Sequence, residues 1–142
     1  AAPDDVLEAD ELCTFVCRRV DKAWLWAVEC RRTRHIVAYA IGDRSEQTCR
    51  HLWHKLPESY RGCQSFSDFW RAYAAVFPVD THQCVGKETG LTAHIERWNN
   101  TLRQRNARYV RKTLSFSKSW RWHHLVTKWL IVSYNHDVSL TI

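Results

Sequence analysis

Three short apolar runs open the chain, separated by polar segments. Ala23–Val28 and Ile36–Ile41 are apolar at every position, and Leu12–Val16 is rich in residues that favour strands. Runs of five or six such residues are typical of strands buried on both faces of a sheet. The polar and basic link Glu29–His35 suits a hairpin. The pattern therefore predicts three consecutive antiparallel strands.

Beyond Gly42 the apolar positions follow the period of a helix in four places. The predicted helices run from a cap at Asp43 or Ser45 to Pro57, over about Phe69–Val76, from a cap at Thr92 to about Lys112, and over about Trp120–Tyr134. Two further strands are expected at Gly62–Phe66 and Thr81–Val85. The resulting order is that of the ribonuclease H-like α/β fold. It has a mixed sheet of about five strands flanked by helices, with the first three strands antiparallel and an additional C-terminal helix.

Four tryptophans on these helices are interpreted first as core residues, because aromatic side chains at helical spacing usually pack inward. They are Trp98, Trp120, Trp122 and Trp129. In the last helix, Trp122 and Trp129 share a face with Leu125, Val126 and Leu130. Trp120 directly follows the polar link 113–119, so it is the best candidate to stack on an unpaired base instead.

Charge is distributed unevenly along the 142 residues, which carry a net charge of +6 at pH 7. Residues 94–142 contain nine lysines and arginines but two acidic residues, whereas 1–93 is close to neutral. Such a segment indicates a polyanionic partner, most simply nucleic acid, and the alternative is a solvated basic helix. No apolar run approaches the roughly 20 residues that span a bilayer, so no membrane partner is expected. The length predicts a single domain over 1–142.

The six cysteines include no C-x-x-C pair and are expected to be free thiols, which suits a reducing, intracellular compartment. Cys13 and Cys17 lie in an apolar stretch and are predicted to be small buried residues. His51 and His54 share a predicted helix and offer a zinc site as an alternative, although no cysteine pair lies nearby to complete it.

The segment from His94 to Arg105 combines two helix faces of different chemistry. Ile95, Trp98 and Leu102 form an apolar face that can pack into a core. A neighbouring face carries one acid, two amides and a base, namely Glu96, Asn99, Asn100 and Arg103. This face is suited to hold a cation and a phosphate side by side.

Three acids lie where the predicted topology would bring them together. Asp10 is placed at the start of the first strand, Asp68 at the end of the fourth, and Glu96 on the long helix. Mg²⁺ prefers oxygen ligands, and two such ions about 3.5–4 Å apart can hold the attacking and leaving oxygens of a phosphoryl transfer. The alternative is that Asp10 is a surface acid, Asp68 a helix cap, and Glu96 a partner of Arg103.

The chain resembles the catalytic domain of bacterial insertion-sequence-one-like (IS-one family) DDE transposases. The matching segments run in order over nearly the whole chain: Glu8–Leu12, Lys22–Trp26, Ile36–Tyr39, Gly42–Ser45, Ser67–Tyr73, Gly86–Gly90, His94–Arg105 and Arg111–Ser119. Asp10 matches the aspartate of the strand motif x-D-E, Asp68 that of S-D-x-W, and Glu96 the glutamate of H-I-E-R-x-N. Asp10 and Glu11 point to opposite faces of a strand, so only one is expected to be a ligand. The resemblance selects Asp10.

The resemblance implies a DNA transposase in which Asp10, Asp68 and Glu96 are the catalytic residues and bind two Mg²⁺ or Mn²⁺ ions, with no organic cofactor. Water would hydrolyse the phosphodiester at the transposon end, and the freed 3′-OH would attack target DNA by transesterification. The implied partners are transposon-end DNA, target DNA and at least one further copy of the chain. The implied location is the bacterial cytoplasm, in association with the nucleoid.

The candidate DNA contacts follow from the basic half of the chain. Candidates for phosphate contacts are Lys87, Arg97, Arg103, Arg105, Arg108, Arg111 and Lys112. Asn99 and Asn100 are candidates to orient ligands or to contact the DNA backbone, and polar surface positions are the alternative.

Three departures from the family pattern concern Cys30, where an aspartate is expected, Asn106, and the aromatic and basic segment Trp120–His124. A zinc ribbon and helix-turn-helix, expected upstream in such transposases, are absent from 1–142. Two alternative functions therefore accompany the transposase. One is a catalytically inactive or domesticated DNA-binding remnant, and the other is a ribonuclease H-like nuclease that cuts without joining strands.

Overall fold

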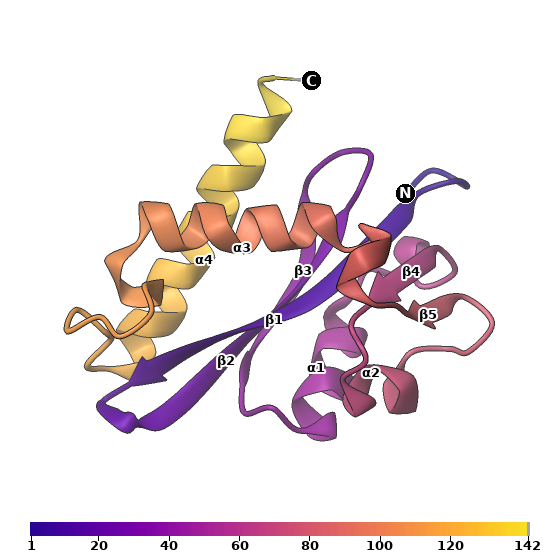
Figure 1. Cartoon of the computed structure of the whole chain (residues 1–142). Coiled ribbons are helices and arrows are strands. Elements are labelled where there is room, and N and C mark those ends of the chain that lie inside the picture. The colour runs from indigo at the N-terminus through magenta and orange to yellow at the C-terminus, as the bar shows by residue number, and fades with distance from the viewer. Residues whose placement is uncertain (142) are drawn as a thin grey trace.

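A computed structural model describes residues 1–141 and contains a mixed five-stranded sheet in the order β3-β2-β1-β4-β5. The antiparallel strands are β1 (Val6–Val16), β2 (Arg18–Cys30) and β3 (Ile36–Gly42). The short strands β4 (Gln64–Ser67) and β5 (His82–Cys84) extend the sheet in parallel from β1. The α/β fold, the antiparallel opening strands and the order of the elements are as predicted (Figure 1), and the arrangement is consistent with a ribonuclease H-like fold.

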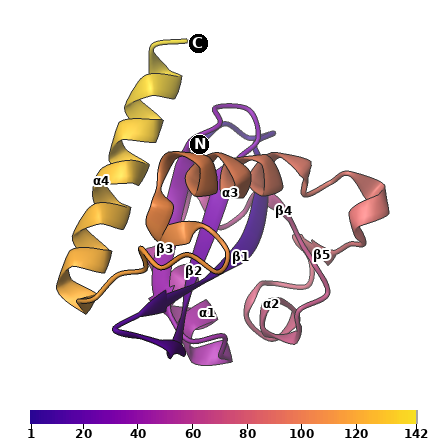
Figure 2. The same ribbon diagram turned by 60° about the vertical axis from the view of Figure 1, so that its left-hand side comes forward.

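Helices cover both faces of this sheet. α1 (Glu46–Lys55) and α2 (Arg71–Val76) pack on one face, and α3 (Ala93–Arg105) lies across β1 and β2 on the other. The long C-terminal helix α4 (Trp120–Ser139) stands beside α3 and contacts β3, as the turned view shows (Figure 2). Single turns of 3₁₀ helix occur at 58–60, 87–89 and 107–109. No helix of the described residues has the length and apolar character needed to cross a membrane.

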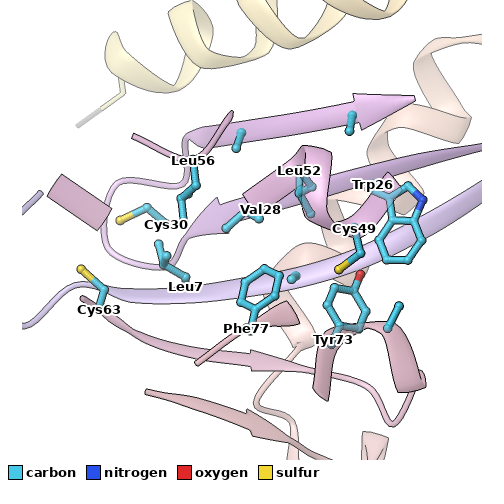
Figure 3. Close-up of a cluster of buried hydrophobic side chains, with 14 residues drawn as sticks. Leu7, Trp26, Val28, Cys30, Cys49, Leu52, Leu56, Cys63, Tyr73 and Phe77 are labelled. Carbon is cyan, nitrogen blue, oxygen red and sulfur yellow. The ribbon is translucent and has the colours of Figure 1, made fainter. Parts of the chain in front are cut away.

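Two clusters of buried side chains fill the spaces on either side of the sheet. Beneath α1 and α2, Trp26 of β2 meets Tyr73 of α2 edge-on, with ring centroids 5.3 Å apart (Figure 3). On the α3 face, Ile95, Trp98 and Leu102 are all buried, which confirms the apolar face predicted for this helix. α3 is therefore held against the sheet by one face, and its neighbouring polar face is fixed in orientation.

Some element boundaries differ from the prediction for local reasons. β1 begins at Val6, six residues earlier than expected, so Asp10 lies in the middle of the strand and not at its start. α3 ends at Arg105 and not near Lys112, because Asn106 is extended and its side chain accepts a hydrogen bond from the Arg108 amide.

The start of α2 also differs. The helix begins at Arg71, so Phe69 and Trp70 precede it and Phe69 is exposed. The cause is Asp68, whose side chain accepts a hydrogen bond from the Trp70 amide at 2.9 Å and closes a turn before the helix.

α4 packs with a different face from the one its apolar residues predict. Its buried residues are His123, Thr127 and Ile131. The ring nitrogens of His123 form hydrogen bonds with Tyr109 and Ser117, and the hydroxyl of Thr127 forms one with Tyr109. Three of the five side chains predicted to pack inward are exposed, namely Trp122 (60%), Leu125 (46%) and Trp129 (66%). The other two, Val126 and Leu130, are partly buried. Trp120, the candidate for base stacking, is 43% exposed.

The cysteines are all free thiols, as predicted. Cys17 is nevertheless exposed, and Cys13 is only partly buried. Cys17 has a positive φ of 66° because it forms the tight turn between β1 and β2, where no core is available. The prediction that both are buried is therefore wrong.

Candidate metal and phosphodiester site

The site lies where β4 stops. β4 pairs in parallel with β1 only over Val6–Glu8 and ends at Ser67, so Asp68 follows directly at the open edge of β1. Asp10 lies two residues beyond the last paired position of β1. The short fourth strand thus places Asp68 beside the free edge of β1 and brings the first two predicted acids together.

Glu11 lies in the same cluster as Asp10, although only one of these two adjacent strand residues is expected to be a ligand. One carboxylate oxygen from each of Asp10, Glu11 and Asp68 lies within 4.8 Å of the other two. Glu11 does start on the opposite face, where its Oε2 accepts a hydrogen bond from Tyr73 Oη of α2 at 2.8 Å. Because no strand covers this edge of β1, side chains from both faces reach around it toward Asp68.

Glu96 and its helix face close the site. A cleft of about 350 Å³ is lined by eleven residues: Asp10, Glu11, Leu12, Arg44, Asp68, Lys87, Glu96, Asn99, Asn100, Arg103 and Arg111. The three predicted acids and the predicted polar face of α3 therefore converge on one cleft. Glu96 stands outside the tight trio and accepts a hydrogen bond from Thr92 Oγ1 at 3.0 Å.

Asn99 connects α3 to the acids. Its side chain is buried, and its Nδ2 donates a hydrogen bond to Asp10 Oδ2 at 2.7 Å. The amide therefore orients the Asp10 carboxylate. Asn100 is exposed at the cleft, where its Oδ1 accepts a hydrogen bond from Arg103 Nη1 at 3.5 Å.

A buried carboxylate that sequence reasoning missed positions α3. Glu8 Oε2 accepts hydrogen bonds from the amides of His94 (2.8 Å) and Ile95 (3.1 Å), and its Oε1 accepts one from Arg31. These amides belong to the first turn of α3, which has no internal acceptors for them. Glu8 thus performs the capping predicted for Thr92, whose side chain makes no capping hydrogen bond and turns to Glu96 instead.

Electrostatics make the cleft suitable for a cation. Burial, together with the charges of Glu11, Asp68 and Glu96, raises the pKa of Asp10 from 3.8 to about 7. Burial also raises the pKa of Glu11, although the hydrogen bond from Arg44 opposes this. The candidate ligand atoms of the acids are all oxygens, and the repulsion between their carboxylates is only partly compensated. These two properties fit a hard divalent cation. The described residues place no third ligand beside His51 and His54, so no comparable zinc cluster forms there.

The predicted DNA-contacting residues separate into two groups. Lys87, Asn100, Arg103 and Arg111 line the cleft. Arg97 faces a different depression, with Glu29 and Arg34, and Arg105 pairs with Asp137 of α4 at 3.4 Å. The side chain of Arg108 contacts Ser117, and Lys112 lies beside Arg111 in an adjoining depression.

Arg44 also lines the cleft and was not among the predicted site residues. It donates to Glu11 Oε1 from Nε at 2.9 Å and from Nη2 at 2.6 Å. The signal that could have found it is its place in the segment Gly42–Ser45, which carries part of the family resemblance.

A family model described as IS1 transposase matches residues 6–136, which include every acid of the cleft. The chain belongs to the IS1 transposase family. It is 38% identical over 121 residues to the insertion element iso-IS1n protein InsB of Shigella dysenteriae, covering 85% of this chain and 89% of the relative. It is 34% identical over 119 residues to the insertion element IS1 protein InsB of Shigella flexneri, covering 84% and 88%. An InsB protein of Escherichia coli strain K12 is 33% identical over 119 residues, covering 84% of this chain and 69% of the relative.

Membership of the IS1 transposase family makes this chain an enzyme of the transposase type with DNA as its partner. The match covers β1 through most of α4, so the elements that build the cleft all lie within the family domain.

Proposed function

We propose that this IS1-family chain is a DDE transposase in which Asp10, Asp68 and Glu96 hold two Mg²⁺ or Mn²⁺ ions. The observation that carries the proposal is the convergence of these three acids, from β1, the end of β4 and α3, on one cleft with basic and amide walls. When bound, such ions neutralise phosphate charge and lower the pKa of water. Glu11 joins Asp10 and Asp68 in the tight trio and is a fourth candidate donor.

The proposed reaction has two phosphoryl transfers. In the first, the oxygen of water bonds to phosphorus at the transposon end, the bond from phosphorus to O3′ breaks, and O3′ takes up a proton. In the second, the freed 3′-OH bonds to a target phosphorus, and a target O3′ leaves. Asn99 fixes the Asp10 carboxylate for both steps, while Lys87, Arg103 and Arg111 hold the DNA backbone in the cleft.

The test is a nicking and strand-transfer assay on insertion-element end DNA with Mg²⁺. Glu96→Gln and Asp68→Asn are each expected to reduce cleavage at least about 100-fold, since each removes a charge that stabilises the reacting centre. Asp80→Asn, which alters an exposed acid outside the cleft, should behave as wild type. Equal cleavage by wild type and Glu96→Gln would refute the assignment. Cleavage without joined product would support the nuclease alternative, and binding without cleavage the inactive remnant.

We also propose that the working form contains at least two copies of the chain, because both ends of an element must be held during one insertion. This need for two copies follows from the proposed reaction. Sedimentation of the protein with paired end DNA measures the number of copies in the complex. A complex of one copy that still joins both ends to a target would contradict this proposal.

A further inference from the structure

Arg44 is held at the wall of the cleft by an unusual set of contacts. Its guanidinium carbon lies 4.6 Å from the ring centre of Trp24 and 4.0 Å from that of Trp70. Its Nε and Nη2 both donate to the same oxygen of Glu11. The guanidinium is therefore fixed between two indole rings and one buried carboxylate, which come from β2, the turn before α2, and β1.

Neutralising Glu11 uses only one edge of this guanidinium. The Glu11 side chain is 1% exposed and needs a positive partner, whereas the Arg44 side chain is 36% exposed. Nη1 has no acceptor among the described residues, and Arg44 lines the same cleft as Asp10, Asp68 and Glu96. A guanidinium carries five N–H donors in a planar fork that matches the oxygens of a phosphate. Most of this donor set is thus free beside the acids.

We propose that Arg44 binds a non-bridging oxygen of a DNA phosphate in the cleft, through the N–H groups that Glu11 leaves free. Trp24 and Trp70 hold the guanidinium in place before DNA arrives, so little side-chain entropy is lost on binding. Lysine cannot replace it, because an ammonium lacks the plane that stacks between two rings and the fork that bonds Glu11 and a phosphate together. This inference rests on the proposed function only in that DNA occupies the cleft.

The experiment measures binding of a short fluorescent DNA duplex in EDTA, so that neither cleavage nor metal binding contributes. Each phosphate contact adds about 0.9 to the slope of log affinity against log salt. Arg44→Gln is expected to reduce that slope by about 0.9 and to weaken binding about tenfold at 0.1 M salt. Arg50→Gln, at an exposed position of α1 outside the cleft, is the matched control and should alter the slope less.

Arg44→Gln leaves Glu11 buried without its partner, which can prevent folding. Comparing Glu11→Gln with the double variant Glu11→Gln/Arg44→Gln avoids this problem, because residue 11 carries a neutral amide in both. The double variant is expected to have a slope lower by about 0.9 than Glu11→Gln alone. Equal slopes for these two variants would overturn the inference and leave Arg44 as a structural counter-ion of Glu11.

The binding result is separable from the proposed reaction. If removing Arg44 reduces the slope while the wild type neither cuts nor joins DNA, the Arg44 contact is supported and the transposase mechanism is contradicted. If the wild type cuts and joins DNA but removing Arg44 leaves the slope unchanged, the mechanism is supported and the Arg44 contact is contradicted.

Discussion

Replacing Glu8 by glutamine should destabilise the protein strongly, although Glu8 is not among the residues that line the cleft. The Glu8 side chain is 1% exposed, and it accepts hydrogen bonds from Arg31, His94 and Ile95. Glutamine keeps one oxygen but removes the charge, and its amide presents donors toward Arg31 or the helix amides. Breaking a buried ion pair by changing one partner costs about 3–5 kcal/mol. Because glutamine retains part of the bonding, we expect a loss of about 3 kcal/mol.

Urea denaturation followed by circular dichroism measures this change, which should appear as a lower midpoint with an unchanged slope. The control is Glu46→Gln, because the Glu46–Arg50 pair on α1 is more than half exposed, at 51% and 54%. That variant should lie within about 0.5 kcal/mol of wild type. If the unfolding midpoint of Glu8→Gln equalled that of Glu46→Gln, the capping of α3 by Glu8 would not be an important source of stability.

The same cleft and core give three further predictions. Asn99→Ala removes the hydrogen bond to Asp10 and should lower cleavage about 10–100-fold at saturating Mg²⁺, with an unfolding midpoint close to that of wild type. Asp10→Asn should stabilise the metal-free protein at pH 8 by about 2 kcal/mol, because the raised pKa of about 7 means that the folded state disfavours the charged form. This gain should shrink as pH falls from 7 towards 4 and vanish below about pH 3, where both states of wild type are protonated. A gain that did not depend on pH would contradict it. Burial lowers the pKa of His82 to about 4, so stability conferred by the neutral ring is lost as pH falls below about 6.5. Relative to His82→Gln, wild type should lose up to about 3 kcal/mol between pH 6.5 and 4 in thermal or urea unfolding.

The order of elements was accessible from sequence because it depends on local patterns. Apolar runs indicated the first three strands, and helical spacing indicated the four helices in their correct order. Asp68 and Glu96 were placed correctly for the same reason, at the end of a strand and on a helix. The long-range contacts of Glu8 and Arg44 have no local signature, since they join residues at least 20 positions apart.

Two features of the structure depend on surroundings that local rules do not include. Strand alternation places Asp10 and Glu11 on opposite faces of β1, but β4 ends too early to cover this edge, and a carboxylate oxygen of each lies near Asp68. The apolar face of α4 was expected to pack inward, yet its buried face is built from His123 and Thr127. Their polar atoms are satisfied by Ser117 and Tyr109, and that network cannot be inferred from hydrophobic periodicity.

The geometry of the cleft depends on how β1 and α3 run alongside each other. Glu8 meets the first turn of α3 at His94 and Ile95, and Asp10, two residues further on the same face of β1, meets Asn99. Two residues of strand advance about 6.8 Å, and the four to five residues of helix between these contacts advance about 6–7.5 Å. The two elements therefore stay in step, and Glu96 is held between the contacts. A slip of one residue in β1 would turn Glu8 and Asp10 to the other face. The contact that stabilises the helix and the contact that orients the acid thus specify the same register, so stability and site geometry are set together.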